Sequence, residues 1–183
     1  MDNYKVTIGV DPGGTTGLAA YYYEPQQWYR TQISNCDTRE GLRRVTSMIH
    51  GIYRRCEPFL AKPTVHILCE QFDFRKDEQF RDKIDYTARE VIGVLKYEFG
   101  FVDFVRLDFT GASLGKGFWT DDKIRRLGLW EPGNKHAMDA TRHVLRYRTF
   151  ERNERDLLRP LRMTQLDDYR EHVPIDEVRT DLV

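Results

Sequence analysis

Four side chains have the chemistry of acids, bases or metal ligands, and they lie far apart in the sequence: Asp11, Glu70, His136 and Asp139. Asp11 and Glu70 each end a short apolar run that is typical of a buried strand. A carboxylate at the end of a buried strand is costly unless it is paired or binds a metal. The glycines after Asp11 leave room for either a phosphate group or a metal ion, so the sequence indicates a site without deciding between them.

The elements around the two strand-end acids predict that these acids lie side by side. Short turns separate three apolar runs, which predicts an antiparallel meander of strands over residues 6–11, 18–23 and 28–34. Asp37 with Glu40 three residues later is typical of a helix N-cap, and Pro58 ends the helix that follows. The next strand, 65–70, comes after this crossover and can therefore run parallel to the first. Ligand sites in open α/β sheets lie at such strand ends.

The last helix of the main body carries the other two candidates. His136, Asp139 and His143 are spaced i, i+3 and i+7 and therefore share one helical face. Ala137 and Ala140 are small, so this helix can pack closely on the sheet. A histidine near solvent on a helix usually has no function. An aspartate between two histidines on one face nevertheless favours a role in the same site as the strand-end acids.

Basic and aromatic residues lie in two segments beside these elements. Residues 71–81 are predicted to form a loop into a helix over 83–99, followed by a strand over 101–107 and a linker over 110–117. Aromatic rings beside cations suit stacking on unpaired bases, and cations among glycines suit phosphate contacts. The candidate nucleic-acid contacts are Phe72, Phe74, Arg75, Lys76, Lys116 and Lys123. Two alternatives stay open: the phenylalanines belong to the core, and the lysines lie on a solvated loop and a short helix over 120–128.

The composition limits the class of protein. The chain has 183 residues, which suits one domain over 1–150 and a charged tail over 151–183 that is partly flexible or ordered by a partner. The net charge is zero, but the tail holds six arginines against nine acidic residues, so the domain carries a basic excess. The three cysteines are isolated, no run nears the roughly 18 apolar residues of a membrane span, and the first strand begins too early for a signal peptide. We therefore expect a cytoplasmic protein with no membrane partner.

The predicted element order is β-β-β-α-β-α-β-α, with acids at the ends of the first and fourth strands and on the last helix. It resembles the ribonuclease H-like fold, an α/β fold with a five-stranded mixed sheet flanked by helices. More closely, the sequence resembles the RuvC family of Holliday-junction resolvases, including the RuvC-like proteins of bacteriophages. Three blocks within residues 4–150 carry the resemblance: Gly9 to Gly13 followed by Gly17, Leu68 to Gln71, and His136 to Ala140. In the family these blocks are G-x-D-P-G, a strand ending in E-Q, and [DH]-x-x-D-A.

The resemblance implies a metal-dependent endodeoxyribonuclease that acts as a homodimer on branched DNA, in the cytoplasm of a bacterium or a phage-infected cell. By position, Asp11, Glu70, His136 and Asp139 would be the catalytic residues and the ligands of Mg²⁺ or Mn²⁺, with two ions expected. Two cations about 3.5–4 Å apart stabilise both the attacking and the leaving oxygens of an in-line displacement. Oxygen-rich sites suit these hard ions. His143 would be a partner for Asp139.

The sequence departs from the family pattern in two respects. The family places an aromatic wedge near the E-Q pair, whereas here Asp73 occupies that position between Phe72 and Phe74. The acidic tail is not part of the bacterial pattern. Lys116 and Lys123 lie where the family carries basic residues that contact DNA. The resemblance makes a four-way junction the expected substrate. Because of the two departures, flaps and forks stay open as alternatives.

Two other functions compete with this hypothesis. Actin-like and sugar-kinase ATPases also have a phosphate loop that reads D-x-G followed by threonines, which Asp11 to Thr16 fit loosely. Those proteins pair two such domains around the nucleotide, and 183 residues supply one. The second alternative is a non-catalytic protein that binds branched DNA, and the intact acids argue against it.

Overall fold

The computed structural model describes residues 4–56, 64–71, 86–111 and 117–161. In chain order the strands and helices are β1 (Val6–Asp11), β2 (Thr15–Tyr22), β3 (Gln27–Ser34), α1 (Arg39–Arg54), β4 (Val65–Gln71), α2 (Tyr86–Phe99), β5 (Val105–Gly111), α4 (Asp121–Arg126) and α5 (Lys135–Arg146). A π-helical turn, η3 (Tyr147–Glu151), and a 3₁₀ turn, η4 (Arg155–Leu158), follow α5. Within these described ranges, no helix is long and apolar enough to cross a membrane.

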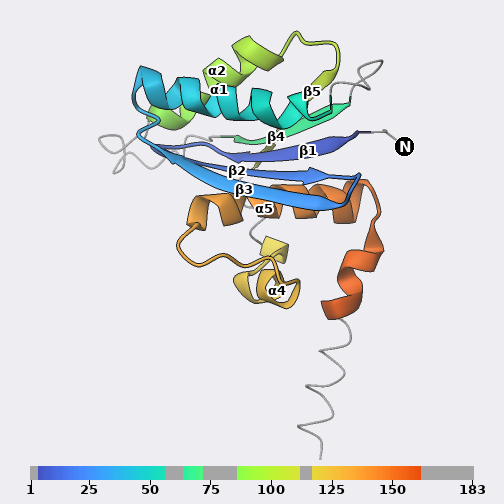
Figure 1. Cartoon of the computed structure of the whole chain (residues 1–183). Helices are drawn as coiled ribbons and strands as arrows, with labels where there is room; N and C mark the ends of the chain where they lie inside the picture. Colours follow the sequence, from blue (N-terminus) through green and yellow to red (C-terminus); the bar gives the residue numbers. More distant parts are fainter. Residues whose placement is uncertain (1–3, 57–63, 72–85, 112–116, 162–183) are drawn as a thin grey trace, which may run out of the picture.

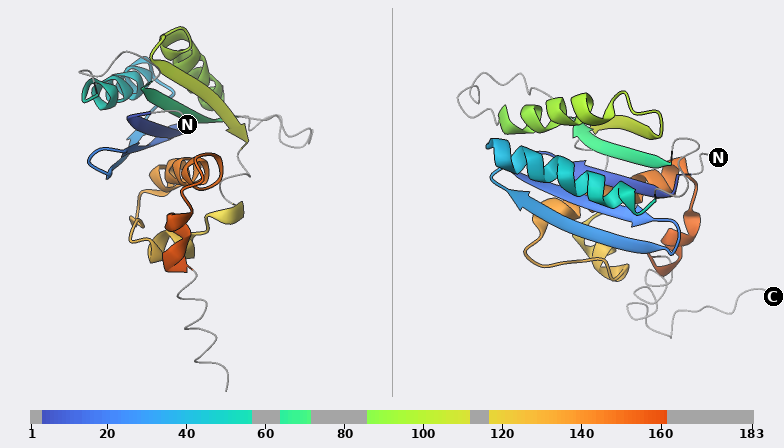
Figure 2. Two further views of the ribbon diagram at one scale, coloured as in Figure 1. Left: turned by 90° about the vertical axis from the view of Figure 1, so that its right-hand side faces the viewer. Right: turned by 45° about the horizontal axis from the view of Figure 1, so that its top comes forward.

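The five strands form one mixed sheet in the order β3-β2-β1-β4-β5. β1 pairs antiparallel with β2 and parallel with β4, and β4 pairs parallel with β5. Helices α1 and α2 cover one face of the sheet, while α5 covers the other face with α4 beyond it (Figures 1 and 2). This architecture confirms the predicted α/β fold with a five-stranded mixed sheet flanked by helices.

Apolar clusters on the two faces of the sheet hold the layers together. The larger cluster lies between the sheet and the helices α1 and α2, and the fully buried Ile8, Ile49 and Ile67 belong to it. The second cluster surrounds Trp119 on the opposite face and joins α4, α5 and the turn after them. Leu161 is buried in this second cluster, so the chain just beyond residue 150 packs against the main body.

The first helix begins one residue later than predicted. Its N-cap is Thr38 rather than Asp37, because the Thr38 hydroxyl accepts the Gly41 N–H at 3.0 Å. The same hydroxyl donates to the Asn35 carbonyl at 2.7 Å. Asn35 has a positive φ of 60°, and its carbonyl oxygen lies 2.0 Å from the place where a Gly41 methyl group would be. This tight turn after β3 makes Thr38 the capping residue.

The last strand is shifted along the chain from its predicted place at 101–107. Phe101 is 92% exposed, and a turn is closed by the Val105 N–H, which donates to the Val102 carbonyl at 2.8 Å. β5 continues instead to Gly111, which lies opposite the end of β4. Apolar residues around 101–105 imitate a strand, but pairing with β4 decides the register. Thr110 consequently belongs to the sheet and not to a linker.

Candidate active site

The two strand-end acids lie on adjacent parallel strands, as the sequence predicts. β1 and β4 are in register through the pair Val10 and Cys69, so Asp11 and Glu70 come directly after this pair. Asp11 is 7% exposed, and the Glu70 side chain is 16% exposed. Both acids therefore lie at the rim of the core, where a charge needs a partner.

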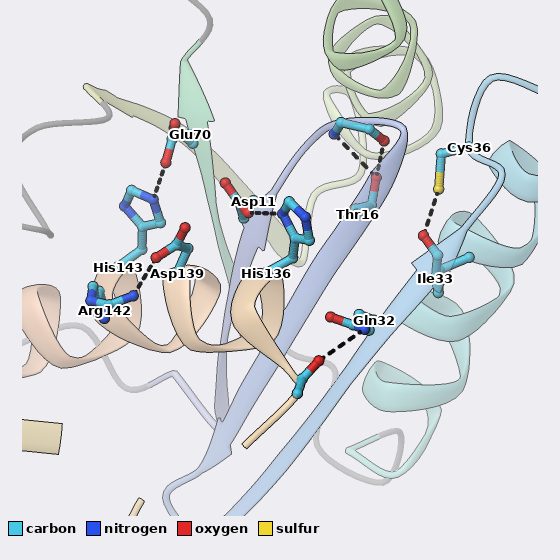
Figure 3. Close-up of polar contacts among 12 residues, drawn as sticks. Asp11, Thr16, Gln32, Ile33, Cys36, Glu70, His136, Asp139, Arg142 and His143 are labelled. Atoms are coloured by element: carbon cyan, nitrogen blue, oxygen red, sulfur yellow. Dashed lines mark hydrogen bonds and ion pairs between the residues drawn. The ribbon is translucent and has the colours of Figure 1, made fainter. Parts of the chain in front are cut away.

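Glycines on the strands allow α5 to approach this end of the sheet. A methyl group on Gly9 would lie 2.1 Å from the Ala140 carbonyl oxygen, and one on Gly17 would lie 2.0 Å from the His136 carbonyl oxygen. The helix backbone therefore rests almost directly on the backbones of β1 and β2. Figure 3 shows His136, Asp139 and His143 of α5 pointing toward the ends of β1 and β4.

Each of the three carboxylates in this region faces a base on α5. The pairs are His136 with Asp11 (Nδ1 to Oδ2, 2.9 Å), His143 with Glu70 (Nε2 to Oε2, 3.0 Å), and Arg142 with Asp139 (Nη1 to Oδ1) (Figure 3). The structure thus gathers all four predicted catalytic residues at one end of the sheet. It also adds His143 and Arg142, and the guanidinium group of Arg142 places a permanent positive charge beside Asp139.

His143 has a different partner from the predicted one. The sequence predicts a contact with Asp139, whereas His143 Nε2 meets Glu70 and Nδ1 lies 3.0 Å from Thr110 Oγ1. Glu70 and Thr110 lie opposite each other on β4 and β5, because β5 extends to Gly111. Strand β4 and strand β5 therefore present their polar groups to one imidazole. Its side chain is only 1% exposed, and the two contacts fix the ring plane.

Arg142 is not among the residues that the sequence predicts for this site. It is 7% exposed, and Nη1 donates to Asp139 three residues earlier on α5. The i, i+3 spacing of an acid and an arginine is a signal for such a pair. The same pattern occurs on many solvated helices, so spacing alone does not distinguish a buried arginine from an exposed one.

The two strand-end acids also act on the buried thiol of Cys69. Burial raises the pKa of the Cys69 thiol, and the charges of Glu70 and Asp11 raise it further. Lys96 opposes this effect with a smaller influence. Asp11 and Glu70 therefore both lie close enough to Cys69 to raise the pKa of its thiol, as expected for two acids at the neighbouring ends of β1 and β4.

The side chains gathered here are of the types that bind hard divalent cations. Carboxylate oxygens supplemented by one imidazole are ligands that Mg²⁺ and Mn²⁺ accept. Among the described residues, however, no group of three or more His, Cys, Asp or Glu side chains is placed to hold a metal ion. Each of the three acids contacts a side chain of α5 in this structure.

Of the predicted nucleic-acid contacts, only Lys123 belongs to the part of the chain that the structure describes. Phe72, Phe74, Arg75, Lys76 and Lys116 lie outside it. Lys123 Nζ donates to the Phe118 carbonyl at 3.0 Å and lies 3.7 Å from the centre of the Phe118 ring. The ammonium group is therefore bound within the chain, and a contact with DNA would compete with these interactions.

Comparison with known proteins yields a match at the level of structure. No family model matches the chain, and no curated protein matches it. The chain is similar to RuvC from T. thermophilus, solved in complex with a Holliday junction substrate, with a TM-score of 0.53 and 18% sequence identity. The match covers 81% of this chain and 96% of that one. The chain therefore has a RuvC-like fold, which is a form of the ribonuclease H-like α/β fold.

Proposed function

We propose that the protein is a structure-selective endonuclease that cleaves Holliday junctions or other branched DNA by metal-dependent phosphodiester hydrolysis. One observation carries the proposal: Asp11, Glu70 and Asp139, from β1, β4 and α5, gather at one end of a RuvC-like sheet. The similar RuvC from T. thermophilus was solved in complex with a Holliday junction substrate. That neighbour supports branched DNA as the substrate class.

Divalent cations would be held by the three acids together with His136. We propose Mg²⁺ or Mn²⁺, with two ions in the complete site. A bound cation of this kind lowers the pKa of water and neutralises a leaving oxygen. Asp11 and Glu70 are each oriented by an imidazole of α5.

His136 is the base that lies best for contact with substrate. Its side chain is 42% exposed, compared with 1% for His143. Asp11 meets His136 at Nδ1, so Nε2 is the atom that would exchange a proton with the attacking water. The carboxylate of Asp11 would orient the ring and stabilise its protonated form. Nε2 cannot bind a cation and accept a proton at the same time, so this role is the alternative to His136 as a metal ligand.

We also propose that two copies of the chain act together in the cytoplasm. A four-way junction must be cut on two equivalent strands, and a homodimer with twofold symmetry presents one site to each. Residues 151–183 would then lie outside the chemistry, and the described part of this segment, up to Leu161, packs against the nuclease domain over 1–150.

The turn between β1 and β2 gives little support to the ATPase alternative. Thr16 is fully buried, and its hydroxyl donates to the Gly13 carbonyl at 3.0 Å. The Gly13 N–H in turn points to the Thr16 hydroxyl oxygen at 3.4 Å. A hydroxyl and an amide that a phosphate loop would direct at its ligand are therefore engaged with each other.

A nicking assay tests the proposal directly. Purified protein is mixed with a synthetic four-way junction, a flap or a linear duplex, each with Mg²⁺, with Mn²⁺ and with EDTA. We expect cleavage of the branched substrates with either cation and none with EDTA. Absence of metal-dependent cleavage on all three DNAs would reject the nuclease. Metal-independent binding to the junction, without cleavage, would favour the non-catalytic alternative, and a rise in melting temperature with ATP would favour an ATPase.

A further inference from the structure

Arg142 is buried where α5 meets the segment that carries α4. Its three guanidinium nitrogens donate to three different residues: Nε to the Trp119 carbonyl at 2.8 Å, Nη1 to Asp139 Oδ1, and Nη2 to Asp121 Oδ1. Figure 3 shows the contact with Asp139. A guanidinium group is planar and keeps its charge at any physiological pH. Three acceptors in different directions therefore fix both its position and its plane.

Two of these acceptors belong to the start of α4. Trp119 is fully buried, and Asp121 is the first residue of the helix. Between them Thr120 caps the helix, because its hydroxyl accepts the Lys123 N–H. The place of Arg142 is therefore set by an anchored tryptophan and by the first turn of a capped helix.

The contact with Asp139 is not needed to dock α4. Trp119 and Asp121 already join the α4 segment to Arg142, whereas Asp139 lies on α5 together with Arg142 itself. Both side chains are 8% exposed, so the contact also compensates two buried charges on α5. What this contact does determine is the direction in which the Asp139 carboxylate faces.

We propose that Arg142 is a positioning residue: held by Trp119 and Asp121, it fixes one oxygen of Asp139 and so orients that carboxylate toward the bound divalent cation. The inference rests on the proposed function, because it takes Asp139 as a cation ligand. The three acids of the site then differ in kind. Two face imidazoles, while Asp139 faces a guanidinium group that keeps its charge and is anchored from α4.

The proposal makes the first turn of α4 a remote determinant of metal binding. Asp121 and its neighbour Asp122 offer a matched pair of substitutions to test this. Both lie in the first turn of α4, but Asp122 is paired with Arg126 at 2.9 Å and does not contact Arg142 in the described structure. Asp121→Asn and Asp122→Asn therefore change the charge of the same helix end equally, and only the first weakens the anchor of Arg142.

The measurements are Mn²⁺ affinity by isothermal titration calorimetry without DNA, the melting temperature, and kcat with KM on a four-way junction. For Asp121→Asn we expect Mn²⁺ affinity and kcat to fall about tenfold, as for other partners of metal ligands, with KM and the melting temperature nearly unchanged. For Asp122→Asn we expect Mn²⁺ affinity and kcat to stay at wild-type values. Arg142→Lys keeps the charge but cannot reach three acceptors, so it should lower Mn²⁺ affinity at least as much as Asp121→Asn.

Equal Mn²⁺ affinities in the two aspartate variants would overturn the positioning role, and so would a change in KM alone. A wild-type protein that binds no Mn²⁺ would overturn it as well, since there would be no cation for Asp139 to face. A wild-type protein that binds Mn²⁺ but cleaves no DNA would reject the proposed function alone. In that case the difference in Mn²⁺ affinity between the variants still decides the role of Arg142.

Discussion

Two buried histidine–carboxylate pairs in this sheet have similar geometry and very different surroundings. His143 and Glu70 are 3.0 Å apart near the end of β4, and His66 and Asp108 are 2.9 Å apart, with His66 near its beginning. His66 is fully buried between aromatic rings: it stacks on Tyr4, and Tyr147 meets it edge-on with ring centres 4.4 Å apart.

The difference lies in the number of acids and in what covers them. Among the described residues Asp108 is the carboxylate that contacts His66, with Arg106 Nε 2.7 Å from it, and Glu151 acts on His66 only as a weaker charge. Around His143 there are acids from β1, β4 and α5 at the rim of the core. A histidine–carboxylate pair by itself is therefore no sign of a reaction site. The accumulation of acids from several elements at an accessible strand end is what distinguishes the candidate site.

The most direct test of this difference removes one acid from each region. We expect Asp11→Asn to reduce cleavage of a four-way junction by about a thousandfold, because loss of a metal ligand removes several kcal/mol of transition-state stabilisation. Binding to the junction, measured by fluorescence anisotropy in EDTA, should persist. Asp108→Asn is the matched control and should leave the kcat of the folded protein unchanged. Similar losses in both variants would show that Asp11 supports the fold and not the reaction.

The second prediction concerns the close contact that brings α5 to the site. A methyl group at Gly17 would overlap the His136 carbonyl, so we expect Gly17→Ala to lower the free energy of unfolding by about 3 kcal/mol as the helix is pushed away. Urea unfolding measures this change.

Gly51→Ala controls for the effect of the substitution itself. Gly51 lies in α1, and a methyl group there would meet nothing within 4 Å. It should therefore raise the free energy of unfolding by about 0.5–1 kcal/mol. If Gly17→Ala were equally harmless, α5 would not be held against β2 as tightly as the structure indicates.

The parts of this site that could be predicted depend on local pattern, and the parts that could not depend on packing. Asp11 and Glu70 end apolar runs that are joined by a crossover. The direction of the two strands and the handedness of the crossover therefore predict that these acids are neighbours. The contact of His143 with Thr110 depends on how far β5 extends along the chain. Pairing with β4 decides this, and local hydrophobicity does not. Arg142 meets Trp119 and Asp121, 23 and 21 residues earlier in the sequence, and no periodicity connects positions so far apart.

The third prediction compares the replacement of each of the two histidines by glutamine. We expect His143→Gln to lower kcat about 10- to 100-fold, since the ring that orients Glu70 is replaced by a less constrained amide. His66→Gln should instead lower the free energy of unfolding and leave kcat per folded molecule unchanged, because His66 contacts no acid of the candidate site. Junction cleavage and urea unfolding of both variants measure the two effects. A loss of kcat in His66→Gln comparable to that in His143→Gln would remove the distinction between the regions.

The smallest expected effect is a dependence of stability on pH that arises from His66. Burial lowers the pKa of His66 below its usual value, and the hydrogen bond to Asp108 only partly opposes this. The folded state therefore binds fewer protons than the unfolded state just below the ordinary histidine pKa of about 6.5. The contribution of neutral His66 is fully present above that pH and is lost as the pH falls.

Urea unfolding of the wild type and of His66→Gln between pH 5 and 7.5 measures this contribution, because the other titrating groups cancel in the difference. The stability advantage of the wild type should shrink as the pH falls below about 6.5, by at most about 1.4 kcal/mol per pH unit for one proton. Within the described structure His66 Nδ1 has no hydrogen-bond partner, so protonation would bury an unpaired N–H. A constant difference across this range would mean that His66 accepts the proton at little cost. The aromatic enclosure would then be no less tolerant of charge than the acid-rich end of the sheet.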